Sequence, residues 1–144
     1  MIEQPYPYFE IRAPTHYFFE SIGEKGSVYK IVEFTLQHNG NWNLGFGDLL
    51  EGQISDTVVT NNQDVRKVIG TVARIAIEFL LQFPDRIIEI EPVDEKRRKL
   101  YNRVFQRYFD EINPLFKVWG TLQAKEEPYV PTKNYDKFRI KIKY

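Results

Sequence analysis

The stretch that decides the fold covers residues 61–112 and has the sequence NNQDVRKVIGTVARIAIEFLLQFPDRIIEIEPVDEKRRKLYNRVFQRYFDEI. Its first part predicts an amphipathic helix, because good N-cap residues (Asn61, Asn62 and Asp64) precede a helical pattern. Pro84 ends that pattern, since proline cannot continue a helix. The apolar positions recur at helical spacing and are Val65, Val68, Ile69, Val72, Ile75, Ala76, Phe79, Leu80 and Phe83.

A short apolar strand and a second helix follow. Residues 86–91, RIIEIE, have helices on both sides in the sequence. Such a strand usually lies inside a sheet, parallel to the strand before the first helix, here residues 57–60. Asp94 can cap the second helix. The apolar stripe of that helix consists of Leu100, Val104, Tyr108 and Ile112.

The rest of the chain predicts mostly strands. Proline in residues 1–14 favours an extended arm with at most an edge strand at 8–12. Residues 17–21 and 27–37 form a hairpin around the glycines of 23–26, and 42–46 extends it into a meander. Residues 115–122 and 138–144 are further strands on either side of a loop at 126–136. We expect a single α+β domain over residues 1–144 with two helices and a mostly antiparallel sheet of about six strands, in the order β-β-β-(β)-α-β-α-β-β.

Composition excludes several classes of protein. Twenty Lys and Arg balance 20 Asp and Glu, so the chain lacks the overall positive field that favours binding to nucleic acid. Residues 1–59 are nevertheless acidic, with three basic residues against eight acidic ones. No cysteine is present, which excludes disulfides and thiolate metal sites and fits the cytoplasm. No signal peptide or membrane-spanning segment is recognisable.

The strongest charge feature is the basic run at the start of the second helix. Lys96, Lys99, Arg103 and Arg107 follow one another at intervals of three, four and four residues and so share one flank, whereas Arg97 and Arg98 point elsewhere. Such a stripe could bind phosphate, RNA or an acidic partner. The alternative is a solvated helix face. Arg97, Lys99 and Arg103 are therefore candidate binding residues.

A second candidate lies at residues 43–48, NLGFGD. Glycine lets a backbone approach a ligand closely, and an acid at a strand end can serve as a base. Asn43 and Asp48 are therefore candidates, although a turn or bulge explains the same pattern. Neither histidine has metal-ligand spacing, and no serine lies in an elbow motif. We predict no metal site and no cofactor.

One further pattern covers most of the chain and consists of residues 17–21, 43–48, 71–72, 83–84, 97–101 and 127–129, together with Gly23, Gly26, Lys30, Asp64 and Gly120. By this pattern the chain resembles a family of short, uncharacterised bacterial proteins with no assigned activity. The sequence departs from the family pattern at residues 92–94, PVD.

The predicted order of elements is also similar to the GNAT N-acetyltransferase fold. In that fold two strands splay apart to admit acetyl-CoA. The resemblance implies that Tyr101 is the general acid that protonates the departing thiolate of coenzyme A. A phenol can perform this proton transfer. The pyrophosphate loop of those enzymes needs glycines at a helix N-terminus. Residues 59–69 offer none before Gly70.

The sequence as a whole favours a non-catalytic binding or protein-interaction module over an enzyme. Its partner would be another protein, or a second copy of the chain bound through an exposed strand edge. An acetyl-CoA-dependent enzyme that uses Tyr101 is the first alternative. Binding of nucleic acid or phosphate through residues 96–107 is the second.

Overall fold

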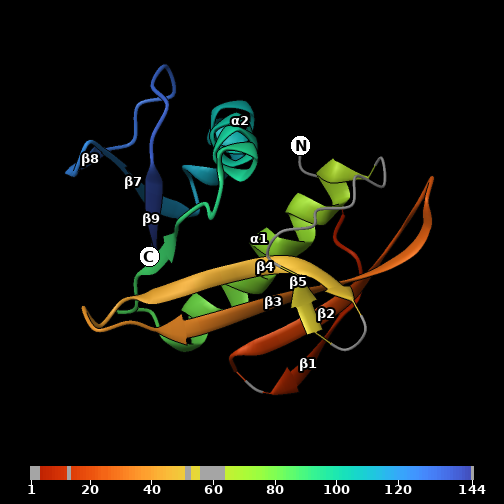
Figure 1. The fold of residues 1–144 in the computed structure, drawn as a ribbon. Coiled ribbons are helices and arrows are strands. Elements are labelled where there is room, and N and C mark those ends of the chain that lie inside the picture. Colours follow the sequence, from red (N-terminus) through yellow and green to blue (C-terminus); the bar gives the residue numbers. More distant parts are fainter. Residues whose placement is uncertain (1–3, 13, 51–52, 56–63, 144) are drawn as a thin grey trace. The chain divides into compact units, whose positions relative to one another are not determined.

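The computed structural model describes residues 4–12, 14–50, 53–55 and 64–143 (Figure 1). The chain divides into two compact units. The N-terminal unit comprises Ile2–Thr35 and Leu44–Phe79, and the C-terminal unit comprises Leu36–Asn43 and Leu80–Tyr144 with Met1. The prediction of a single domain stays a prediction, and each unit is described by itself.

The N-terminal unit is built on an antiparallel meander. Its strands are β1 (Tyr8–Arg12), β2 (His16–Gly23), β3 (Gly26–Leu36), β4 (Trp42–Leu50) and β5 (Gln53–Ser55). They lie in the order β1-β2-β3-β4, with β5 on β4. Gly26 has a φ of +84° at the β2–β3 turn, a value that glycine adopts without strain. The predicted hairpin and the predicted edge strand at 8–12 are confirmed.

Helix α1 (Val65–Gln82) packs its apolar face into the core of this unit, beside buried residues of β2 and β3. The ring of Phe79 stacks on that of Phe34 in β3, with centroids 4.0 Å apart. Phe79 and Ile75 are fully buried, and Val68 and Ala76 nearly so. The predicted apolar face is therefore the face that packs.

Charged side chains are also buried in the N-terminal unit. Lys30 Nζ lies 2.5 Å from Asp48 Oδ1, and both side chains are almost inaccessible to solvent. Asp64 Oδ2 accepts hydrogen bonds of 2.5 Å from the hydroxyls of Tyr6 and Ser21, which connects the start of α1 to β2. Burial, followed by the bond to Asp64, raises the pKa of Tyr6. Lys30 and Asp48 are buried and depend on ion pairing to remain inside the protein, whereas Asp64 is only partly buried.

Replacing Asp48 with Ala leaves the Lys30 ammonium buried without this carboxylate. Breaking a buried ion pair in this way costs about 3–5 kcal/mol of unfolding free energy. Urea denaturation of Asp48→Ala is the measurement, and the double variant Lys30→Met/Asp48→Leu is the control. Because the double variant buries no lone charge, it is expected to lose less stability than Asp48→Ala. Equal losses would contradict the ion-pair explanation.

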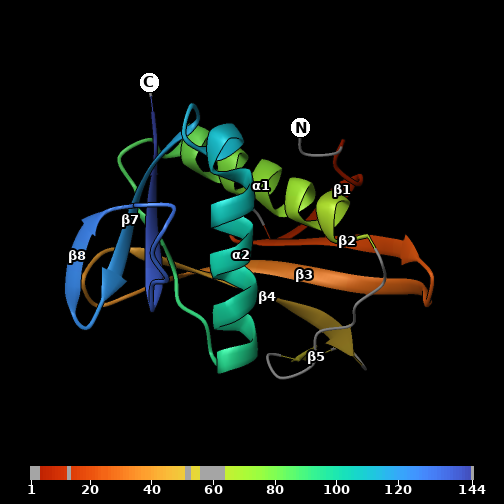
Figure 2. The ribbon, with the colours of Figure 1, turned by 90° about the horizontal axis from the view of Figure 1, so that it is seen from above.

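The C-terminal unit contains a mixed sheet and the second helix. Its elements are β6 (Ile88–Ile90), α2 (Glu95–Ile112), β7 (Phe116–Leu122), β8 (Lys125–Pro128) and β9 (Lys137–Ile142). The strand order is β4-β6-β9-β7-β8, where β4 contributes Trp42 and Asn43. Figure 2 shows β7, β8 and β9 side by side. The described part of the chain is thus α+β with two helices and a mostly antiparallel sheet, as expected, but it has nine strands rather than six.

The parallel neighbour of β6 differs from the prediction. Residues 57–60, the expected neighbour, lie outside the described residues. Strand β6 instead pairs in parallel with β4, where Trp42 lies opposite Ile88 and Asn43 opposite Glu89. Its other edge pairs antiparallel with β9. Both edges of β6 are therefore occupied, one by Trp42 and Asn43 of β4 and the other by β9.

Strand β8 falls partly in the predicted loop at 126–136. It is joined to β7 by a tight turn at Gln123 and Ala124, whose φ values are 51° and 65°. Tight hairpin turns with two positive φ values normally contain glycine or asparagine. Because neither is present at Gln123 and Ala124, no turn pattern predicts this hairpin.

Aromatic rings form the core between α2 and the sheet of the C-terminal unit. Phe105 stacks on Phe138 of β9 with centroids 4.2 Å apart, and Tyr129 contacts both rings. Gly120 makes room for Tyr135, since a Cβ at Gly120 would lie 2.4 Å from that ring. No helix in the described residues is long and apolar enough to cross a membrane.

Candidate functional site

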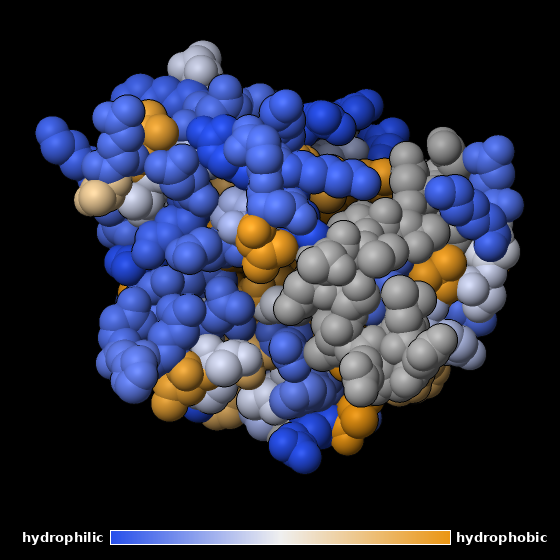
Figure 3. All heavy atoms as spheres, in the orientation of Figure 1, coloured by the Kyte–Doolittle hydropathy of each residue, from blue (hydrophilic) through white to orange (hydrophobic). Residues whose placement is uncertain are grey.

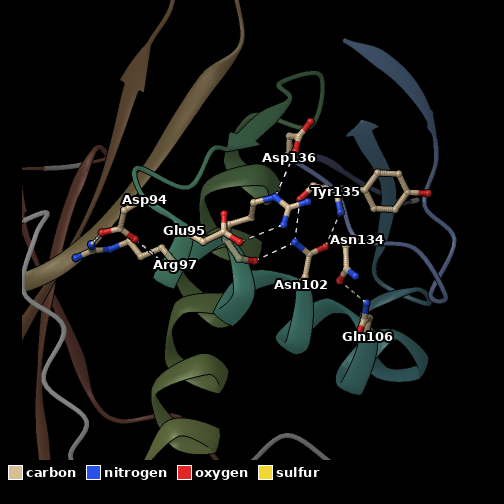
Figure 4. A network of polar contacts seen from close by, with 9 residues as sticks. Asp94, Glu95, Arg97, Asn102, Gln106, Asn134, Tyr135 and Asp136 are labelled. Carbon is tan, nitrogen blue, oxygen red and sulfur yellow. Dashed lines mark hydrogen bonds and ion pairs between the residues drawn. The ribbon is translucent and has the colours of Figure 1, made fainter. Parts of the chain in front are cut away.

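The start of α2 is fixed by Asp94. Its backbone is extended, and its Oδ1 accepts a 2.8 Å hydrogen bond from the Arg97 N–H, as an N-cap should. Its Oδ2 lies 2.8 Å from Arg97 Nη1 (Figure 4). Arg97 is only 3% exposed. The predicted cap is confirmed, and the candidate binding residue Arg97 is held inside the protein.

One flank of α2 is fastened to the loop before β9 (Figure 4). Asn102 Nδ2 donates to the carbonyl of Tyr135 at 2.8 Å, and the Tyr135 N–H donates to Asn102 Oδ1 at 2.7 Å. Arg98 Nε reaches Asp136 Oδ1 at 3.3 Å one turn earlier, and Gln106 Nε2 donates to Asn134 Oδ1 at 3.1 Å one turn later. These contacts set the rotation of the helix about its axis.

The solvent-facing side of α2, next to this flank, carries the four cations of the predicted stripe. Lys96, Lys99, Arg103 and Arg107, which we call the basic stripe, are all exposed. No ion pair with a described residue is found for the first three, and Arg107 contacts the ring of Tyr108 at 5.9 Å. The backbone departs from helical angles only at Tyr108, after the stripe ends. The stripe therefore lies on a regular helix and spans about 16 Å.

The candidate residues from the sequence do not form one site. Lys99 and Arg103 lie together on the basic stripe. Asn43 lies in β4 opposite Glu89, and Asp48 is buried with Lys30 in the N-terminal unit. The part of the structure described contains no group of three or more residues suited to bind a metal ion.

Sequence reasoning missed the fastening residues Asn102 and Tyr135. Asparagine is a poor helix former because its side chain competes for backbone groups. Asn102 nevertheless lies inside a helix among apolar residues and is 2% exposed. A polar, poorly helix-forming residue among apolar positions could have indicated that the Asn102 amide binds backbone outside the helix.

A family model described as "Family of unknown function (DUF6934)" matches residues 2–143 of the chain. The chain belongs to this family. The predicted resemblance to a family without assigned activity is therefore confirmed, across almost the whole sequence. No curated protein and no solved structure matches the chain.

The resemblance to GNAT N-acetyltransferases is not supported. No solved structure of that fold matches, and β6, which was expected to splay from a neighbour, is paired on both edges. Tyr101 lies on α2 and is partly buried. Its proposed role as a general acid stays a prediction.

Replacing Asn102 with Ala tests the fastening of α2. The change leaves the N–H and carbonyl of Tyr135 without these partners in a buried position, so we expect a loss of about 2–4 kcal/mol of unfolding free energy. Gln106→Ala, one turn later, removes only exposed contacts and is expected to cost less than about 0.5 kcal/mol. Chemical denaturation of both variants gives the comparison. Similar losses would contradict the assigned role of Asn102.

Proposed function

We propose that the chain is a non-catalytic protein-interaction module that binds an acidic partner through the basic stripe of α2. The proposal rests on a difference between two groups of cations on this helix, one paired with carboxylates and the other not. Arg97 and Arg98 are paired with Asp94, Glu95 and Asp136, whereas Lys96, Lys99 and Arg103 have no carboxylate partner in the described residues. Hydrophilic side chains occupy the surface over α2 in Figure 3.

The stripe is unfavourable for the helix by itself. Like charges three or four residues apart destabilise a helix by about 0.2–0.5 kcal/mol per pair. Lys96 and Lys99 also lie near the positive end of the helix dipole. An acidic partner would relieve both penalties, so binding and helix stability would reinforce each other.

The basic stripe is preorganised for binding. Because Asn102 and Arg98 fix the adjacent flank, the cations keep one orientation and a partner need not order the helix. Arg103 can bind a carboxylate through two parallel hydrogen bonds. The aromatic residues of α2 are buried or partly buried, so the stripe offers bases no platform for stacking. An acidic polypeptide therefore suits it better than nucleic acid.

The direct test uses fluorescein-labelled poly-L-glutamate and fluorescence anisotropy at low salt. Lys99→Gln/Arg103→Gln is expected to weaken binding roughly tenfold and to reduce its salt dependence, because fewer charges are neutralised. The matched control is Lys25→Gln/Lys125→Gln, which removes the same charge from two exposed lysines outside α2. The control should bind within about twofold of the unmodified protein.

Two results would overturn the proposal. One is equal weakening in the two double variants, since net charge alone would then explain binding. The other is the absence of any binding to poly-L-glutamate at low salt.

Acetyl-CoA binding by Tyr101 is the alternative function. We expect isothermal titration with acetyl-CoA to show no binding, because a strand lies on each side of β6 and leaves no opening there. Micromolar binding that Tyr101→Phe alters would restore the enzyme interpretation.

We also infer a bacterial origin and a cytoplasmic location. The resemblance to short bacterial proteins supports the first. The absence of cysteine from the sequence is compatible with the second.

A further inference from the structure

The sheet of the C-terminal unit has a second basic surface, on the side away from the aromatic core. On β7 and β9 alternate residues are buried, and Phe138 of the buried set stacks on Phe105 of α2. The residues between them point to the other face of the sheet. We call this the basic sheet face; it consists of Lys117, Trp119 and Thr121 from β7 and Lys137, Arg139 and Lys141 from β9.

The strand register concentrates positive charge at one end of this face. Lys117 lies directly opposite Lys141, and Trp119 lies opposite Arg139. Side chains of directly opposed residues stand about 5 Å apart, and like charges in that position repel. No ion pair is found for either lysine among the residues that the structure describes. This pair therefore favours an anion placed between the two ammonium groups.

The carboxylates near the basic sheet face form ion pairs with cations other than Lys117 and Lys141. Arg139 binds Glu89 at 3.1 Å and Glu126 at 3.0 Å. Glu89 also accepts 2.8 Å hydrogen bonds from the amides of Asn39 and Asn41. Burial by itself would raise the pKa of Glu89, but these bonds and the nearby cations outweigh it and lower that pKa, so Glu89 stays charged. The acids of the face therefore neutralise Arg139 rather than the Lys117–Lys141 end.

An aromatic ring lies beside that end. Trp119 follows Lys117 on the same face and is partly exposed. Cations that hold phosphates next to an aromatic ring that stacks on bases form the usual site for single-stranded nucleic acid. The net charge of the C-terminal unit is also favourable, with 14 Lys and Arg against 10 Asp and Glu, or +4. The zero charge of the whole chain conceals this excess.

We propose that the basic sheet face binds single-stranded nucleic acid, with a phosphate between Lys117 and Lys141 and a base stacked on Trp119. Single strands fit better than a duplex because only an unpaired base can present its ring to Trp119. The site is separate from the basic stripe, which lies on the exposed flank of α2. It does not depend on the function proposed for that stripe.

The experiment measures anisotropy of fluorescein-labelled oligothymidylate and oligouridylate at low salt. Lys117→Gln/Lys141→Gln and, separately, Trp119→Leu should each weaken binding roughly tenfold. Lys25→Gln/Lys125→Gln is the matched control, because both lysines are exposed and lie outside the basic sheet face and the basic stripe. It should bind within about twofold of the unmodified protein. The two oligonucleotides distinguish a DNA ligand from an RNA ligand.

Folding of the variants is checked by thermal unfolding. Lys117→Gln/Lys141→Gln removes a repulsive pair and is expected to keep full stability, so its loss of binding would not reflect unfolding. Three results would overturn the proposal: no binding of either oligonucleotide, equal loss in Lys25→Gln/Lys125→Gln, and equal affinity for a duplex of the same length. A stacked base should also quench tryptophan fluorescence, and quenching that survives in Trp119→Leu would contradict the placement of the base.

Discussion

The pair of hydrogen bonds between Asn102 and the backbone of Tyr135 is the constraint on which the C-terminal unit depends. It joins the middle of α2 to the loop before β9 and so fixes which side of the helix faces the sheet. With that rotation set, Phe105 meets Phe138 in the core, while Lys99 and Arg103 remain in solvent. Tyr135 is in turn held by its close fit on Gly120. A helix free to rotate by a quarter turn would bury the basic stripe or expose the aromatic rings.

The two units use charge in different ways. The N-terminal unit buries charge in the pair of Lys30 with Asp48, and it partly buries the Asp64 carboxylate, which receives two hydroxyls. Loss of one partner of a buried pair leaves an uncompensated charge in the interior. The C-terminal unit places cations in rows on its surface, one on α2 and one on the sheet. A net charge of zero for the whole chain is thus the sum of an acidic unit and a basic unit, and it says little about either surface.

Elements governed by local periodicity could be predicted from the sequence. Both helices, the hairpin of β2 and β3 and the final strand follow from the spacing of apolar residues, and the basic stripe follows from the intervals between its cations. Features that depend on distant partners could not be predicted. The pairing of β6 with β4 joins segments more than 40 residues apart. Arg97 was predicted as a binding residue from the basic run, and Asp48 from its place at a strand end. Both are buried in ion pairs, which no local pattern reveals. The basic sheet face exists only because the register places Lys117 opposite Lys141.

Lysine acylation followed by mass spectrometry tests most directly whether α2 is the surface that binds an acidic partner. The protein is treated with an amine-reactive ester with and without saturating poly-L-glutamate, and the reactivity of each lysine is compared. We expect poly-L-glutamate to protect Lys96 and Lys99, which lie on the basic stripe, while the exposed Lys25 and Lys125 keep their reactivity. If Lys96 and Lys99 stay fully reactive while Lys117 and Lys141 are protected, α2 is not the surface that binds the acidic chain.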